Sequence, residues 1–248
     1  MNRLHLHMTD AQSWPLEIPA LPELVSKGAY APGLSYNPAC LGKMQEYAAY
    51  LGIEMIIEID MPGHTSSIAF SHPELITGSN IQPNWQDYSA QPGSGQLKLN
   101  ETAVEAFLAS LWEDLLPRVS PFTSYFHTGG DEINVNPYKL QEGLRTNDTK
   151  ILQPLLQKFI DFNHDRIRGA GLTPIVWEEM LVQWNLTLGR DVLVQTWGST
   201  PSALAQTVEK GYKAIASDYN YWVSAFLPPN LVCSNSATKN QSQLCLLC

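Results

Sequence analysis

The 248-residue sequence lacks the features of several broad classes of protein. No run of about 18 apolar residues occurs, so no segment is predicted to span a membrane. The opening residues, MNRLHLHMTD, have no apolar central region and are not expected to form a signal peptide. Basic residues are few, because 15 Lys and Arg stand against 24 Asp and Glu, for a net charge of −9. We therefore expect no nucleic-acid partner, and a neutral or cationic substrate fits better.

Cysteine is also scarce, and its positions do not settle the redox compartment. Cys40 stands alone, whereas Cys233, Cys245 and Cys248 lie in the last part of the chain. The closing CLLC has the spacing of a metal or redox motif, but no second pair accompanies it. The composition changes near residue 228, so we expect residues 228–248 to be an irregular tail.

What is present indicates one globular α/β domain. Hydrophobic residues make up 44% of the chain and charged residues 16%, which is enough for a large core. Several short runs are almost continuously apolar, as buried parallel strands usually are. The predicted strands are 3–8, 53–59, 124–128, 173–177, 191–197 and 212–217.

Helical patterns lie between most of these runs. The predicted helices are 38–51, 101–116, 150–169 and 201–210. Pro38 is placed near a first turn, and Asn100 is the expected cap of the second helix. Alternating strands and helices predict a parallel sheet with crossover connections. The long segment 61–99 is expected to form a functional loop or lid, or to contain small structure of its own.

Polar and aromatic residues follow the predicted strands where each strand ends. In a barrel of parallel strands the active site lies at these carboxyl ends. Acids, a histidine and tryptophans gathered there would form an acidic pocket with aromatic walls, which suits a sugar. The residues are Asp10, Asp60, His64, Asp131, Glu132, Trp177, Glu178 and Trp197.

The stretch HTGGDE, residues 127–132, carries two adjacent acids after an apolar run. On an extended segment, Asp131 and Glu132 would point in different directions, toward different parts of one ligand. Two close carboxyl groups also separate their pKa values, which leaves one ionised and one protonated. The two glycines permit unusual backbone angles and the close approach of a ligand. A solvated turn with two surface acids is the alternative, which the position at a strand end disfavours.

HTGGDE resembles the His-x-Gly-Gly-Asp-Glu signature of glycoside hydrolase family 20, the β-N-acetylhexosaminidases. The segments NRLHLHMTDAQSWPLEI, EIDMPGH, VWEEM and LVQTWG also resemble segments of this family, in the same order, and the resemblance covers about residues 1–222. It implies a (β/α)8 TIM-barrel fold, incomplete, with about strands 2 to 7 of the barrel in residues 1–227.

The resemblance also implies a mechanism without a cofactor, in which the 2-acetamido group of the substrate acts as nucleophile with retention of configuration. Asp131 would orient the acetamide N–H, and Glu132 would protonate the leaving oxygen and then activate water. Asp10 and His64 would form a hydrogen-bonded relay toward Glu132. Trp177 and Trp197 would form walls of the acetamide subsite, and His127 would support the turn. In the alternative interpretation the tryptophans are core residues and His64 only fixes its loop.

The implied substrates are glycans or chitin oligosaccharides that end in N-acetylglucosamine or N-acetylgalactosamine, and the preference between the two sugars stays open. Proteins of the family are often dimeric, and the oligomeric state here is open too. By resemblance the protein is secreted or vacuolar/lysosomal. Four N-glycosylation motifs agree with this location, although so short a motif also occurs by chance. They begin at Asn100, Asn147, Asn185 and Asn240.

A metal-dependent hydrolase is the competing interpretation. His5 and His7 lie on one face of a predicted strand, as in the first strand of metal-dependent amidohydrolase barrels. Such sites need further histidines on later strands. The later strand ends carry Trp177 and Trp197 instead, so we expect no metal.

Parts of the family pattern have no counterpart in this sequence. They are the arginine that grips the sugar's 3- and 4-hydroxyls, the small N-terminal domain and the eighth strand. The positions of the family's Tyr-Leu-Asp segment read Val223 and Ala225. A truncated gene model, a frameshift and a retained intron would each produce these differences. They predict little hydrolase activity for the chain as given, and the alternative function is an inactive fragment that binds sugar weakly at most.

Overall fold

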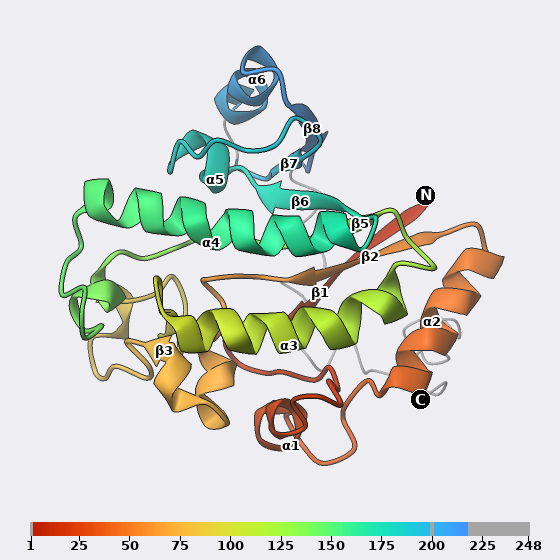
Figure 1. Ribbon diagram of the computed structural model, residues 1–248, viewed down its shortest axis with the longest axis horizontal. Coiled ribbons are helices and arrows are strands. Elements are labelled where there is room, and N and C mark those ends of the chain that lie inside the picture. Colours follow the sequence, from red (N-terminus) through yellow and green to blue (C-terminus); the bar gives the residue numbers. More distant parts are fainter. Residues whose placement is uncertain (1, 199–200, 218–248) are drawn as a thin grey trace, which may run out of the picture.

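The computed structural model describes residues 2–198 and 201–217. Its main sheet has six parallel strands in the order β1-β2-β5-β6-β7-β8, and all six predicted strands are confirmed (Figure 1). The strands are β1 (Arg3–Thr9), β2 (Glu54–Ile59), β5 (Tyr125–His127), β6 (Thr173–Trp177), β7 (Leu193–Thr196) and β8 (Lys213–Ala216).

The register of the first three strands sets the position of the site. His7 of β1 pairs with Glu58 of β2, and Glu58 pairs in turn with His127 of β5. Paired residues on adjacent strands present their side chains to the same face of a sheet. The three side chains therefore form one row across three strands, immediately before the strands end.

Helices connect successive strands, as the alternating pattern predicts. Among them, α3 and α4 lie side by side on the same face of the sheet (Figure 1). The four predicted helices correspond to α2, α3, α4 and α6, while α1 and α5 are additional short helices. The bounds are α1 (Glu23–Gly28), α2 (Pro38–Tyr50), α3 (Thr102–Val119), α4 (Thr149–Gly169), α5 (Glu179–Val182) and α6 (Pro201–Glu209).

The helix starts follow local sequence in two cases and depart from it in one. Asn37 caps α2 by accepting the N–H of Cys40, with Pro38 in the first turn, and Asp148 caps α4. The predicted cap Asn100 is wrong, because the N-cap of α3 is Glu101, whose side chain makes no capping hydrogen bond. Asn100 has a φ of 57° and lies one residue before the cap, in the left-handed region.

The segment 61–99 contains small structure of its own, which confirms the second of the two expectations for it. Strands β3 (Ile76–Thr77) and β4 (Gln96–Leu97) form an antiparallel pair there. Three short 3₁₀ helices precede or separate them, η1 (Ser66–Phe70), η2 (Pro73–Leu75) and η3 (Trp85–Asp87), and a fourth, η4 (Asn136–Lys139), follows β5. Ser66 Oγ donates to the carbonyl of Ala11 at 2.9 Å, which ties this segment to the loop after β1.

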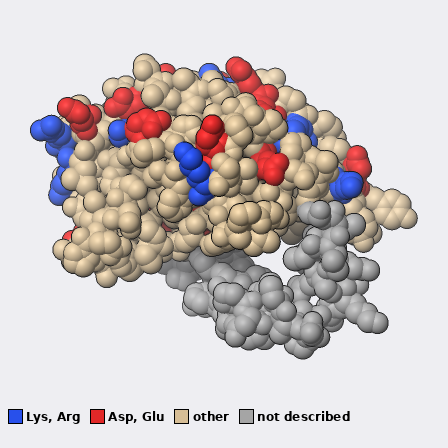
Figure 2. All heavy atoms as spheres, turned by 90° about the horizontal axis from the view of Figure 1, so that it is seen from below, with Lys and Arg blue, Asp and Glu red and all other residues tan. Residues whose placement is uncertain are grey.

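Charged side chains are mixed on the face drawn in Figure 2, where Lys and Arg alternate with Asp and Glu and leave no continuous basic area. No helix in the described ranges is long and apolar enough to cross a membrane. Residues 218–248 lie outside the described part of the chain. The expectations for the tail 228–248, for Val223 and Ala225, and for Asn240 fall within that range.

Removing the Asn163 side chain should destabilise the contact between α3 and α4. Asn163 Oδ1 accepts the indole N–H of buried Trp112 at 2.7 Å. Asn163→Ala leaves that donor without its partner, so we expect a loss of about 1–3 kcal/mol in the free energy of unfolding, measured with urea. Lys158→Ala is the control, because its exposed ion pair with Glu105 is worth about 0–1 kcal/mol. Equal losses for the two variants would contradict the importance of the buried bond.

Candidate active site

The ends of β1, β2 and β5 bring four carboxyl groups around one imidazole. His64 Nδ1 lies 2.9 Å from Asp10 Oδ1, and His64 Nε2 lies 3.3 Å from Glu132 Oε2. The same Nε2 is 3.8 Å from Asp60 Oδ2 and 3.8 Å from Asp131 Oδ1. The structure thus brings Asp10, His64, Asp131 and Glu132 together at the carboxyl end of the sheet, where the sequence placed them.

The two glycines of HTGGDE let the backbone pass close to Asp60. A Cβ atom on Gly129 would lie 1.8 Å from Asp60 Oδ1, and one on Gly130 would lie 2.4 Å from Met180 Cε. Both residues have positive φ angles, and the N–H of Gly130 donates to Asp60 Oδ1 at 2.7 Å. Any larger residue would push this strand end away from β2. The glycines therefore allow the backbone to lie close to the buried Asp60 carboxyl group.

Glu132 is not extended, and this overturns one expectation from the sequence. Its φ is 49°, and His64 has the same φ, which is uncommon for residues with a side chain. With this turn, the Asp131 and Glu132 carboxylates do not point apart, because both approach His64 Nε2. Sparsely populated backbone angles of this kind concentrate at functional sites.

The carboxylates determine the charge of His64. Burial by itself would lower the pKa of this imidazole, but Asp60, Asp10, Glu132 and Asp131 together raise it well above its ordinary value. Burial would raise the pKa of Asp10, yet its hydrogen bonds with His64 and His7 lower it. Protonated His64 and ionised Asp10 therefore form a stable pair at neutral pH.

Asp131 behaves differently from Asp10. Burial and then the neighbouring Asp60 carboxyl raise the pKa of Asp131 well above its ordinary value. Burial also raises the pKa of Asp60, which has no exposure to water. The acid that shifts the pKa of Asp131 is thus Asp60 on the neighbouring strand, whereas the sequence suggested its chain neighbour Glu132.

The indole N–H of each tryptophan donates to an acid, which is buried in one case and half-buried in the other. Trp177 is 2% exposed, and its indole N–H donates to Glu58 Oε1 at 2.8 Å. Trp197 is partly buried, and its indole N–H donates to Glu179 Oε1 at 3.0 Å. Their assignment as walls of a sugar subsite stays a prediction, because the contacts found are with Glu58 and Glu179.

Sequence reasoning missed Glu179, although VWEEM carries two adjacent acids at a strand end, as HTGGDE does. Burial and then the charge of Asp131 raise the pKa of Glu179 to about 7. It also missed the residues of segment 61–99 that line a pocket beside Glu132. Tyr88, Gln91 and Gln96 line this pocket together with His64 and Glu132.

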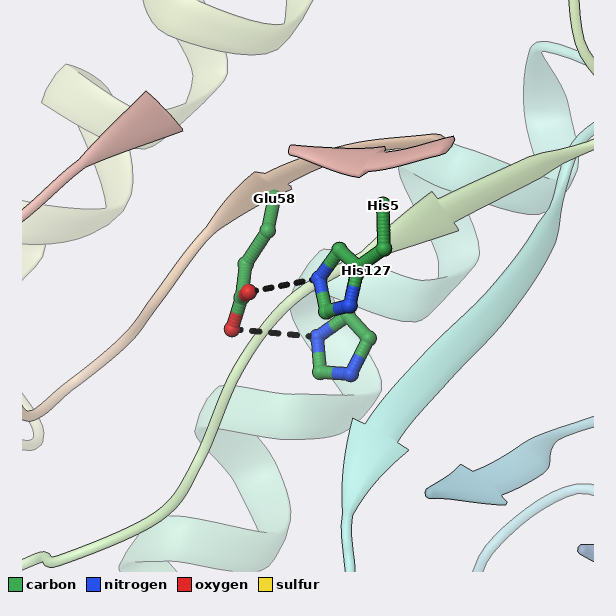
Figure 3. Close-up of side chains that lie close together, drawn as sticks. All are labelled: His5, Glu58 and His127. Carbon is green, nitrogen blue, oxygen red and sulfur yellow. Dashed lines mark hydrogen bonds and ion pairs between the residues drawn. The ribbon is translucent and has the colours of Figure 1, made fainter. Parts of the chain in front are cut away.

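Several of these side chains also have the spacing of metal ligands. Within the described ranges the groups are His5–Glu58–His127, His7–Asp10–His64, His7–Glu58–Asp60 and Asp60–His64–Asp131. Direct hydrogen bonds already join some members, such as His5 Nε2 and Glu58 Oε2 at 2.7 Å. Figure 3 shows Glu58 facing His5 and His127. A shared proton thus accounts for the contact between His5 and Glu58.

Parallel strands joined by helical crossovers, with polar residues gathered at their carboxyl ends, are the arrangement found in α/β-barrel enzymes. The model for the catalytic domain of glycosyl hydrolase family 20 matches residues 1–236, and the chain belongs to this family. This confirms the expected (β/α)8 fold class, of which the described residues contain six strands of the main sheet.

Individual relatives agree with this family. The chain is 42% identical over 242 residues to a beta-hexosaminidase of Arthroderma benhamiae, covering 92% of this chain and 40% of the relative. It is 33% identical to the probable beta-hexosaminidase fdl of Drosophila melanogaster, covering 90% and 34%. The structure of a Flavobacterium johnsoniae chitobiase superposes with a TM-score of 0.73 at 26% identity, covering 88% of this chain and 33% of that one. The chain therefore spans 40% or less of each of these relatives.

Replacing Glu179 should change stability in a pH-dependent way. Its pKa is about 7 in the folded protein against an ordinary 4.5, so its ionisation removes stability as pH rises from 4.5 through 7. Glu179→Gln cannot ionise but still accepts the Trp197 N–H. As the pH rises from 4 to 8, the free energy of unfolding of the variant should increase relative to that of wild type by on the order of 1–2 kcal/mol, measured by urea unfolding.

Glu142→Gln is the matched control for this measurement, because Glu142 is exposed. Its stability difference from wild type should be the same at both pH values. A pH-independent difference for Glu179→Gln as well would show that Glu179 does not titrate in this range.

Proposed function

We propose that this chain carries the catalytic residues of a β-N-acetylhexosaminidase-type glycoside hydrolase. The observation that carries the proposal is the His64 ring, whose Nδ1 lies 2.9 Å from Asp10 while its Nε2 lies 3.3 Å from Glu132. Glu132 is partly exposed beside a pocket, so a ligand has access to it. The relatives named beta-hexosaminidase support the same activity.

The proposed reaction is substrate-assisted hydrolysis with retention of configuration. The acetamide oxygen of the substrate attacks the anomeric carbon while Glu132 protonates the leaving oxygen. With the proton of the Asp60–Asp131 pair on buried Asp60, the ionised Asp131 accepts the acetamide N–H and stabilises the positive charge that develops on the ring formed. Protonated His64 then stabilises the Glu132 carboxylate, which next removes a proton from the attacking water.

The proposed substrates are glycans that end in N-acetylglucosamine or N-acetylgalactosamine, and chitin oligosaccharides among them. The similarity to a chitobiase supports the chitin oligosaccharides. Trp177 and Trp197 are the proposed apolar walls for the acetamide, since Trp177 is the last residue of β6 and Trp197 follows β7, at the end of the sheet where the acids gather. Tyr88 and Gln91 of segment 61–99 line the pocket beside Glu132.

Glu132→Gln tests the proposed role of the acid. Gln keeps the size of the side chain but has no proton to donate to the leaving oxygen, so kcat/KM should fall by about 10²–10⁴. Aryl N-acetyl-β-glucosaminides and N-acetyl-β-galactosaminides are the substrates for the assay, and Glu142→Gln is the exposed control. Circular dichroism establishes that each variant is folded.

Turnover that survives in Glu132→Gln would remove Glu132 from the mechanism. No turnover by folded wild-type chain would favour the alternative function, a fragment that binds sugar weakly at most. Binding of N-acetylglucosamine, followed by calorimetry, then measures what the fragment retains.

We further propose that the protein is a secreted or vacuolar/lysosomal glycoprotein. The supporting observation is that Asn100, Asn147 and Asn185 are all exposed to solvent, as an acceptor asparagine has to be. Expression in a secreting eukaryotic cell should give a chain that loses mass on treatment with an endoglycosidase. The triple Asn→Gln variant should show no loss from these sites, and an unchanged wild-type mass would contradict the proposal.

A further inference from the structure

A buried carboxylate lies directly beneath the candidate site. Glu58 has no exposure to water, although it is a charged residue in the buried part of strand β2. In Figure 3 it faces His5 of β1 and His127 of β5. Glu58 Oε2 lies 2.7 Å from His5 Nε2 and 3.0 Å from His7 Nδ1, while Oε1 accepts the Trp177 N–H at 2.8 Å. A carboxylate removed from water needs such donors and a compensating positive charge.

His127 does not supply that charge. The N–H of Gly129 donates to His127 Nδ1 at 2.9 Å, so this nitrogen carries no proton. Its approach to Glu58 Oε1, at 3.3 Å, is therefore a contact between two acceptors. Burial also lowers the pKa of His127 to about 3, which keeps the ring neutral.

His7 is placed to supply the positive charge that the Glu58 carboxylate needs. Its Nδ1 faces Glu58 Oε2 at 3.0 Å, and its Nε2 faces Asp10 Oδ2 at 3.4 Å. A ring with carboxylate oxygens at both nitrogens is satisfied only when both nitrogens are protonated. The His7 side chain is 32% exposed, and its partial burial alone would lower the pKa, but Asp10, Glu58 and Asp60 raise it to about 11.

The contacts continue from His7 to the candidate acid. Asp10 uses Oδ2 for His7 and Oδ1 for His64, and His64 uses its other nitrogen for Glu132. The order of groups is Glu58, His7, Asp10, His64 and Glu132, with negative and positive charges alternating along the first four. Asp10 is thus held at both oxygens, since His64 and the N–H of Ala11 contact Oδ1 while His7 faces Oδ2.

We infer that Glu58 and His7 are positioning residues. The buried Glu58 carboxylate holds His7 as an imidazolium, and His7 in turn fixes the Asp10 carboxylate toward His64. The effect of these residues on Glu132 as the catalytic acid rests on the proposed function. The charge state of His7 does not depend on it. The charged or titratable groups that face His7 are Glu58 and Asp60 from β2 and its end, Asp10 after its own strand, His64 and His127, while His5 shares the Glu58 carboxylate with it.

The test is nuclear magnetic resonance of the 248-residue chain with ¹⁵N-labelled histidine. In wild type we expect His7 to keep both ring nitrogens protonated until well above pH 9, since its pKa is about 11, beside the second protonated ring of His64, whose pKa is also raised. His7→Gln assigns the His7 signal by its loss. In Glu58→Gln the titration midpoint should fall by about 2 units or more, because the nearest negative charge is gone. The midpoint of His64 should move as well.

Glu54→Gln is the matched control, because Glu54 lies on the same strand but pairs with Arg3 at the other end. It should leave the His7 midpoint unchanged. A wild-type chain without such an imidazolium above pH 8 overturns the inference with no variant needed, which covers the case in which Glu58→Gln does not fold. An unchanged His7 midpoint in folded Glu58→Gln overturns it too.

Kinetics separate positioning from a purely structural role. For any substrate that the chain hydrolyses, His7→Gln should lower kcat about 10- to 100-fold and change KM less than about threefold, because Asp10 and His64 act on the acid rather than on binding. A raised KM with unchanged kcat overturns the positioning role. Glu132→Gln should abolish turnover yet leave the His7 midpoint in place, so failure of the proposed activity and failure of this inference give different results.

Discussion

The parallel register of β1, β2 and β5 is the constraint on which the site depends. It places His7, Glu58 and His127 side by side across three strands. The residues that follow these strands then emerge at one edge, so the Asp10 and Glu132 carboxylates reach the two nitrogens of a single imidazole. A shift of one residue in any of the three strands would turn this row to the opposite face of the sheet.

Charge balance at this edge explains the divergent pKa values. Five carboxyl groups gather there, but the described residues supply only two rings, His7 and His64, whose nitrogens both face carboxylates. The five acids are Asp10, Glu58, Asp60, Asp131 and Glu132. The acids in closest contact with these rings, Asp10 and Glu58, have lowered pKa values, whereas Asp60 and Asp131 face one another and have raised ones. A site that holds neutral and ionised carboxyl groups together is suited to proton transfer near neutral pH.

Most of the framework followed from local pattern. Continuous apolar runs predict buried parallel strands, and the periodic stripes of α2, α3 and α4 predict the crossover helices, because burial of apolar surface dominates both choices. Asn100 failed as a cap since the chain turns through a left-handed residue before α3 begins, which short-range propensity does not reveal. HTGGDE was identifiable as a site because charge after a buried strand is costly without a purpose.

The sequence by itself determined the parallel strands, the acids and histidine at their ends, and the family to which the chain belongs. Only the tertiary structure decided which charges meet. Asp60 rather than Glu132 shifts the pKa of Asp131, and Glu58 lies 119 positions before the tryptophan that it binds. The physical reason is that local propensity acts over a few residues, whereas hydrogen bonds and pKa shifts depend on distances of a few ångströms between strands that are remote in the chain.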